Sequence, residues 1–242
     1  MPIIMLSSLL RGTTWETIQY YLLMFLVLCI SLSVHEASHG WAAYKLGDDT
    51  AYLQGRLTLN PLAHLDPIGT ISFLLAGIGW ARPVPINPTR FDAKHSMKKG
   101  IVISSLAGPA SNIVLSVVSA LAFFINMTVA MLIGISPDNA VYGILTNFFY
   151  LMYFYNIILA VFNLLPVPPL DGFKIFGALL PNRVYYRLMS YERYIGLVFL
   201  LLVIFGRGIL SNIIQTVSFP FRLVIWDPLE MLFRAIWQAL GI

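Results

Sequence analysis

The chain has 242 residues, of which 58% are hydrophobic and only 11% are charged, and its formal net charge is +4. A soluble domain of this size could not bury so much apolar surface and would aggregate. The composition therefore excludes an ordinary soluble enzyme, and the small net charge gives no sign of nucleic-acid binding. We predict an all-α polytopic membrane protein that forms a single domain over residues 1–242.

Four apolar stretches have the roughly 20 residues that a helix needs to cross a bilayer. They are Thr17–Tyr44, Lys99–Met127 (apolar onward to Ile135), Val141–Leu165 and Tyr194–Thr216. A fifth, Pro67–Ala81, is too short to cross comfortably and contains three glycines, so we expect a re-entrant or interfacial helix there. The tail from Ser218 mixes charged with large apolar residues, a pattern typical of an amphipathic interfacial helix.

Basic residues gather in two of the connections between these stretches. Seven lie between Ala42 and Lys99 and four between Pro166 and Arg193, whereas residues 128–140 have none. Because positive residues mark the cytoplasmic side of a membrane, we predict that both basic connections are cytoplasmic and that the N-terminus lies outside. The opening 16 residues lack a basic region ahead of their apolar residues, so we expect no cleaved signal peptide.

The connection after the first stretch contains a candidate β-hairpin. Residues Ala51–Leu59 place apolar and β-prone side chains on both sides of Gln54-Gly55-Arg56, which favours two short strands and a turn. A hairpin at membrane depth needs protein groups or a water-lined cavity to satisfy its open backbone.

Two histidines and a glutamate end the first apolar stretch, in VHEASHG (residues 34–40). Residues four apart share a helix face, so His35 and His39 can bind one ion, with Glu36 next to it. This is the H-E-x-x-H arrangement, in which the histidines hold zinc and the glutamate acts as general base. Ionisable groups in a membrane helix are costly and usually functional, which favours this interpretation over buried groups that merely pair with neighbouring helices.

A catalytic zinc site also needs a third protein ligand. The third apolar stretch ends in NLLPVPPLDGFK (residues 163–174), where Asp171 is the sole acid between Asp138 and Glu192. The charge pattern places Asp171 and His39 at the same depth, near the cytoplasmic face. Asp171 is therefore the best candidate for the third ligand.

The two motifs together resemble those of the site-2 protease family of intramembrane zinc metalloproteases. HEASH lies on an early membrane helix, NLLPVPPLDG follows far downstream, and SLAGPASN (residues 105–112) is similar to a small-residue pattern on the family's second core helix. The likeness extends from about Ser31 to Leu180. It is strongest to compact prokaryotic members that have no inserted PDZ or CBS domain.

The resemblance implies one zinc ion per chain, with the ligands His35, His39 and Asp171. Glu36 matches the family's catalytic acid and base. Asn163 matches an asparagine thought to bind the substrate or the oxyanion, and Asn112 matches the second-helix asparagine, with a weaker role. The hairpin at Ala51–Leu59 resembles an element thought to pair with an unwound substrate strand.

The implied activity is hydrolysis of peptide bonds in or near transmembrane segments of membrane proteins, as in regulated intramembrane proteolysis. The expected location is a prokaryotic plasma membrane, in which the chain is multi-pass and its active site is nearer the cytoplasm. Residues 17–180 would form the catalytic core and residues 194–242 accessory helices. Two alternatives stay open from the sequence: a membrane metal transporter, and a catalytically silent scaffold that binds membrane helices.

Overall fold

The computed structural model describes residues 15–76, 79–94, 96–205 and 207–242. The expectations of an uncleaved signal region and an external N-terminus fall largely on residues 1–14, which lie outside the described residues. The chain divides into two compact units, Met1–Gly100 and Ile101–Ile242.

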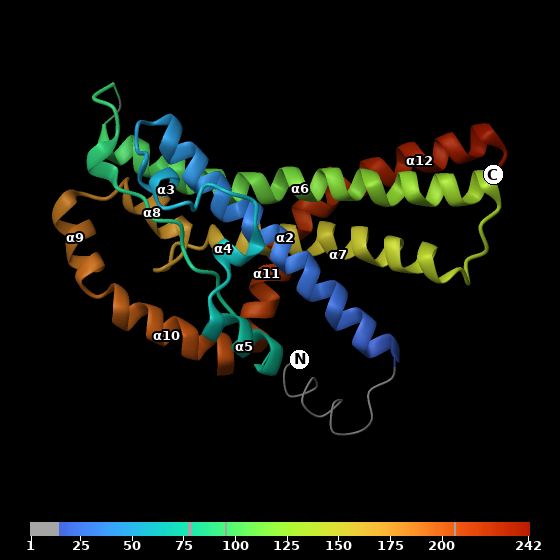
Figure 1. Ribbon diagram of the computed structural model, residues 1–242, viewed down its shortest axis with the longest axis horizontal. Helices are drawn as coiled ribbons and strands as arrows, with labels where there is room; N and C mark the ends of the chain where they lie inside the picture. Colours follow the sequence, from blue (N-terminus) through green and yellow to red (C-terminus); the bar gives the residue numbers. More distant parts are fainter. Residues whose placement is uncertain (1–14, 77–78, 95, 206) are drawn as a thin grey trace. The chain divides into compact units, whose positions relative to one another are not determined.

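The first unit is built on one long helix, α2 (Trp15–Lys45). Short elements follow it: α3 (Thr50–Leu53), α4 (Pro61–His64), α5 (Pro67–Ala76) and the 3-10 turn η1 (Pro88–Arg90). Both α3 and α4 pack against α2 (Figure 1). Helix α5 has 10 residues, or about 15 Å of length, so within the described residues this segment is too short to cross a bilayer, as predicted.

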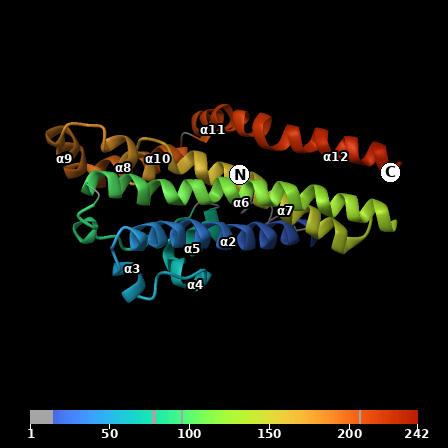
Figure 2. The ribbon, with the colours of Figure 1, turned by 90° about the horizontal axis from the view of Figure 1, so that it is seen from above.

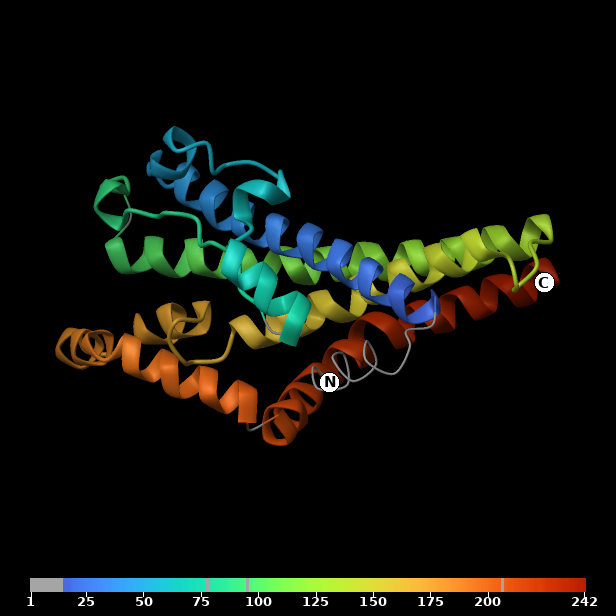
Figure 3. The same ribbon diagram turned by 60° about the horizontal axis from the view of Figure 1, so that its bottom comes forward.

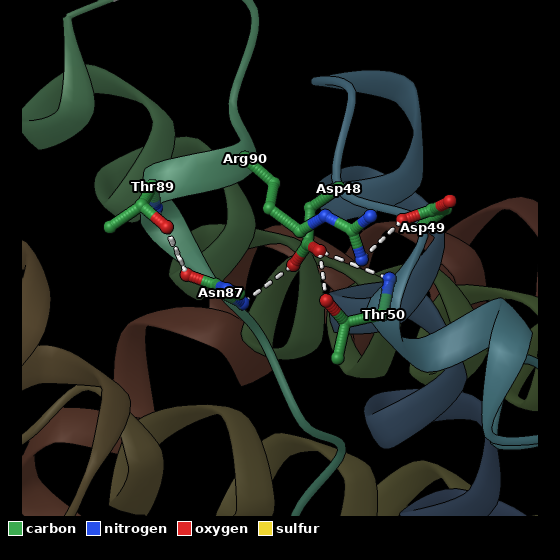
Figure 4. Close-up of polar contacts among 6 residues, drawn as sticks. All are labelled: Asp48, Asp49, Thr50, Asn87, Thr89 and Arg90. Atoms are coloured by element: carbon green, nitrogen blue, oxygen red, sulfur yellow. Dashed lines mark hydrogen bonds and ion pairs between the residues drawn. The ribbon is translucent and has the colours of Figure 1, made fainter.

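The turn after α2 is tied to the loop that contains η1 (Figure 4). Asp48 is fully buried, and its Oδ2 accepts the backbone N–H of Asn87 at 2.6 Å. Its Oδ1 accepts the backbone N–H of Thr50 at 3.0 Å and also the Thr50 hydroxyl. At the exposed rim, Arg90 Nη1 lies 2.8 Å from Asp49 Oδ1. These contacts fix the far end of residues 79–92 against the end of α2.

The prediction of a β-hairpin at Ala51–Leu59 is wrong. Thr50–Leu53 forms the helical turn α3, and no strand occurs among the described residues beyond an isolated bridge between Leu65 and Ala81. The turn itself is present, because Gly55 has a φ of +65°. Arg56 then points inward to bind carbonyls 26 and 27 residues away. The residues expected to form the second strand therefore follow a side chain held by long-range contacts, and they have no partner strand.

The second unit is a set of helices, the first of which begins four residues before it. They are α6 (Met97–Ile133), α7 (Ala140–Asn163), α8 (Asp171–Gly177), α9 (Asn182–Ser190), α10 (Glu192–Phe205), α11 (Arg207–Phe221), the π-helical turn η2 (Arg222–Trp226) and α12 (Asp227–Leu240). Helices α6, α7 and α12 run side by side (Figures 2 and 3). The buried core joins α6, α7 and η2 through Ala120, Tyr153, Ile157, Val161 and Ile225.

Three helices among the described residues are long and apolar enough to cross a membrane: Thr17–Lys45, Met97–Ile133 and Ala140–Asn163. They confirm the first three predicted spans to within a few residues. The fourth, Tyr194–Thr216, is shared between α10 and α11, which have 14 and 15 residues, and residue 206 lies outside the described residues. A fourth crossing stays a prediction.

The predicted tail from Ser218 is helical as far as Leu240, through the end of α11, η2 and α12. Its charged side chains are paired within the tail: Arg222 Nε lies 3.3 Å from Asp227 Oδ1, and Arg234 Nη2 lies 2.7 Å from Glu230 Oε1. Trp237 Nε1 donates to Thr128 Oγ1 of α6 at 2.8 Å. Helix α12 therefore contacts α6, beside which it runs (Figures 2 and 3).

Two buried asparagines link α6 to α7. Asn112 Nδ2 donates to Asn156 Oδ1 at 2.7 Å, Asn156 Nδ2 donates to the Met152 carbonyl at 2.7 Å, and both side chains are 0% exposed. Polar side chains of membrane helices commonly form such interhelical bonds. The Asn112 amide is therefore used in helix packing, as a donor to Asn156.

Replacing Asn112 by leucine should therefore destabilise the fold. The change leaves the buried Asn156 oxygen without this donor, which costs about 1–3 kcal/mol. We expect the Asn112→Leu/Asn156→Leu double variant to lose less than the sum of the two single variants, because both polar partners are then gone. Unfolding in mixed detergent micelles measures each loss, and strictly additive losses would show that the contact carries no coupling.

Candidate metal centre

The two histidines of HEASH lie on one buried face of α2. Their side chains are 3% and 6% exposed, and His35 Nε2 lies 3.0 Å from His39 Nε2. The helix brings them together because a spacing of four residues returns to the same face after about one turn. The predicted convergence of the two ring nitrogens is confirmed.

Imidazole nitrogens at this separation suit a tetrahedral zinc ion. Two nitrogens that are each about 2.0–2.1 Å from zinc are about 3.3 Å from one another, close to the 3.0 Å between His35 Nε2 and His39 Nε2. The pair is also shielded from solvent, which suits neutral imidazole ligands. The residues therefore fit the metal that H-E-x-x-H predicts.

Glu36 lies next to this pair and is only partly buried. Its Oε2 accepts the backbone N–H of Val84 at 2.8 Å, across 48 positions of sequence. A long-range backbone donor thus fixes one oxygen of the proposed general base.

Val84 belongs to an extended stretch, residues 82–87, which we call the 82–87 segment. Its first residue, Arg82, donates its N–H to the His64 carbonyl at 2.7 Å, and its last, Asn87, donates to Asp48. In addition, Arg56 Nη2 donates to the carbonyls of Arg82 at 2.7 Å and of Pro83 at 3.2 Å.

From sequence, Arg82 is one of the seven basic residues that mark the cytoplasmic side, and Arg56 is another that also lies in the turn of the expected hairpin. Pro83 and Pro85 were the sequence signal for an extended segment here, because proline fixes its own φ and restricts the residue before it to extended conformations.

Asp171 lies in the second unit, as the first residue of α8, and is 6% exposed. The helix α7 ends at Asn163, and the turns of residues 164–170 lead into α8. Asp171 Oδ1 lies 3.5 Å from Lys174 Nζ. A buried carboxylate is a chemically suitable zinc ligand.

Gly172 permits this turn because a side chain has no room there. An added Cβ would lie 2.2 Å from the Leu164 carbonyl oxygen and 2.5 Å from that of Leu165. The glycine of the L-D-G motif is therefore a packing requirement that sets the position of its neighbour Asp171.

We expect Gly172→Ala to destabilise the protein by about 1–3 kcal/mol, the usual cost of overpacking, and to weaken zinc retention through the displaced Asp171. The matched control is Gly143→Ala in α7, where an added Cβ meets nothing within 4 Å; alanine is favoured there by roughly 0.5–1 kcal/mol. Thermal unfolding and zinc content of both variants decide the point. Equal stability of the two would contradict the crowding at Gly172.

The two asparagines singled out from sequence are both in the second unit. Asn163 is the last residue of α7, and its Nδ2 donates to the Leu159 carbonyl at 2.9 Å. Asn112 lies in the middle of α6, in the buried contact with Asn156 described above. Asn163 is thus at the helix end that precedes Asp171, whereas Asn112 is within the helix packing.

Comparison with known proteins decides the family. The model of peptidase family M50 matches residues 126–204, a range that contains Asn163 and Asp171. A protein of Bacillus subtilis (strain 168), provisionally named zinc metalloprotease YwhC, is 40% identical over 217 residues, which are 90% of this chain and 93% of that protein. The chain belongs to peptidase family M50, the site-2 protease family.

Longer M50 relatives match less completely. The provisionally named zinc metalloprotease Rip2 of Mycolicibacterium smegmatis is 33% identical over 63% of this chain and 54% of its own length. Its namesake in Mycobacterium tuberculosis (strain H37Rv) is 28% identical over 68% of this chain and 61% of its own length. No solved structure matches the chain.

Membership of M50 makes the chain a zinc metallopeptidase of the intramembrane type. Its three long apolar helices agree with an integral membrane protein.

Proposed function

We propose that one zinc ion is held by His35, His39 and Asp171, with Glu36 as general base, in an enzyme that cuts peptide bonds in or near transmembrane segments. The observation that carries the proposal is the 3.0 Å approach of the two Nε2 atoms on a buried face of a candidate membrane helix. The burial of Asp171 within the L-D-G motif supports its part. An H-E-x-x-H pair in an M50 chain has a ready chemical use in peptide hydrolysis.

Each residue of the proposed site has a separate part in the reaction. Zinc, when bound, supplies Lewis-acid chemistry that polarises a carbonyl and makes water easier to deprotonate. Glu36 takes a proton from the attacking water while the oxygen of that water bonds to the scissile carbonyl carbon. Glu36 then returns that proton to the leaving amine as the C–N bond breaks. The Asn163 amide donates to the oxyanion in between, and Asn112 supports this arrangement through helix packing.

A membrane helix must unwind before it can be cut, because its amides are hydrogen-bonded within the helix. Substrates would therefore be membrane proteins, or peptides from them, whose transmembrane segments unwind readily. The absence of a hairpin at Ala51–Leu59 removes the strand-pairing role given to it from sequence, and we do not propose it again.

The arrangement in the membrane is also a proposal. The chain would act as one domain, with residues 17–180 as catalytic core and residues 194–242 as accessory helices. A fourth crossing near Tyr194–Thr216, cytoplasmic loops at residues 42–99 and 166–193, and an active site nearer the cytoplasm follow from the charge distribution. The membrane would be a prokaryotic plasma membrane.

The test uses the full chain purified in detergent. Elemental analysis should give one zinc per chain, and the protein should cleave a model membrane helix that contains helix-breaking residues. A chelator should stop cleavage, and added zinc should restore it. Zinc that is bound without cleavage of any such helix would count against the protease proposal and favour a silent scaffold or a transporter.

A further inference from the structure

The Glu36 carboxylate is held by a backbone group from the 82–87 segment. Val84 N–H donates to Oε2 at 2.8 Å, and Oε1 is the oxygen left for a water proton. A general base acts efficiently only when its orientation is fixed, and that orientation normally depends on supporting hydrogen bonds. The support here comes from a main-chain group, so no side-chain motif in the sequence would reveal it.

Arg56 holds the two peptide units just before Val84. Its guanidinium donates to the carbonyls of Arg82 and Pro83, at 2.7 Å and 3.2 Å, and the residue is 8% exposed. Burial, helped by the nearby charge of Arg82 and opposed by Glu36, lowers the pKa of Arg56. Burying a cation against neutral carbonyls costs free energy. A role in positioning the active site would explain why the chain buries Arg56 there.

Both ends of the segment also have backbone anchors that do not involve Arg56. Arg82 N–H is bound to the His64 carbonyl and Asn87 N–H to Asp48, which fixes where the segment begins and ends. Arg56 instead contacts the carbonyls of its first two residues, directly before the N–H that meets Glu36. The side chain of Val84 also packs closely on Gly40 of α2, since a Cβ added at Gly40 would lie 3.1 Å from Val84 Cγ1. This packing is a second restraint on the position of Val84.

We propose that Arg56 and the Val84 amide are positioning groups for the general base. Arg56 sets the Arg82 and Pro83 peptide units, these aim the Val84 N–H, and that N–H fixes Glu36 with one oxygen directed to water. The proposal rests on the assignment of Glu36 as base in the proposed function.

The test compares kcat, KM and zinc content for the full chain in detergent, with a model membrane peptide as substrate. Arg56→Gln removes the guanidinium, and Arg90→Gln is its matched control, since Arg90 makes an exposed ion pair with Asp49 near the same loop. Val84→Pro removes the N–H, and Ile86→Pro adds a proline to the same segment outside the contact. Wild type and Glu36→Gln are measured in parallel.

We expect Arg56→Gln and Val84→Pro each to lower kcat by about 10- to 100-fold, the usual cost of losing a supporting contact. KM and zinc content should not change, because substrate and metal groups are untouched. Arg56→Lys should recover part of kcat, since an ammonium can still reach a carbonyl. The Arg56→Gln/Val84→Pro double variant should fall no further than the worse single variant, because both act through one path.

Three results would overturn the proposal: wild-type kcat in both single variants, multiplied losses in the double variant, or a raised KM at unchanged kcat. If Arg56→Gln fails to fold, as judged by its melting and zinc content, Arg56→Lys and Val84→Pro still decide. Cleavage by Glu36→Gln would refute the proposed function instead, so the two failures are separable.

Discussion

Cleavage should nearly stop when Glu36 is replaced by glutamine, while zinc stays bound. Positioned general bases contribute about 100- to 10,000-fold to rate, and glutamine cannot take the proton from water. Its amide oxygen can still accept the Val84 N–H that now meets Glu36 Oε2 at 2.8 Å, so the fold should survive. Initial rates on a model membrane helix, beside zinc content by elemental analysis, measure both effects.

Glu230→Gln is the matched control for this change. Glu230 pairs with Arg234 on α12, and surface ion pairs contribute only about 0–1 kcal/mol to stability, so its cleavage rate should stay near wild type. A Glu36→Gln protein that cleaves normally would remove Glu36 from the mechanism. A variant that loses its zinc together with its activity would instead point to a role in metal binding.

Asp171→Asn should weaken zinc binding and abolish most of the activity. The substitution keeps the size of the side chain but removes the negative charge that a zinc ligand needs. The loss should exceed the roughly 10- to 100-fold that removal of a supporting residue costs. Zinc retained after dialysis against a weak chelator, followed by the cleavage rate in the same sample, tests the expectation.

Asp138→Asn serves as the control, because Asp138 is exposed in the connection between α6 and α7. It should keep both its zinc and its activity. Full zinc content and wild-type cleavage in Asp171→Asn would exclude Asp171 as the third ligand. The histidine pair of the first unit would then need a different partner.

The long helices and the histidine pair were predictable from sequence because both depend on local patterns. Apolar length alone placed the first three spans within a few residues of α2, α6 and α7. The pairing of His35 with His39 follows from helix periodicity, which does not depend on the rest of the fold. Asp171 was found by its motif, and its burial agrees with a role in the site.

The loop region was less predictable because long-range contacts hold it. Leu57, Thr58 and Leu59 have β-prone side chains, but the neighbouring Arg56 is directed into the protein by carbonyls at Arg82 and Pro83. Strand propensity is a weak preference that tertiary contacts override. The 82–87 segment was missed for the same reason, since its partners at Glu36, Asp48, Arg56 and His64 are 18 or more positions away.

The C-terminal helices carry their own counterions. Arg222 is matched by Asp227 and Arg234 by Glu230, so this arm can lie along apolar α6 without drawing a compensating charge from elsewhere. A chain that stopped at Trp226 would keep the cation of Arg222 and lose its anion. Shortened forms of the chain should therefore end ahead of Arg222 or retain Asp227.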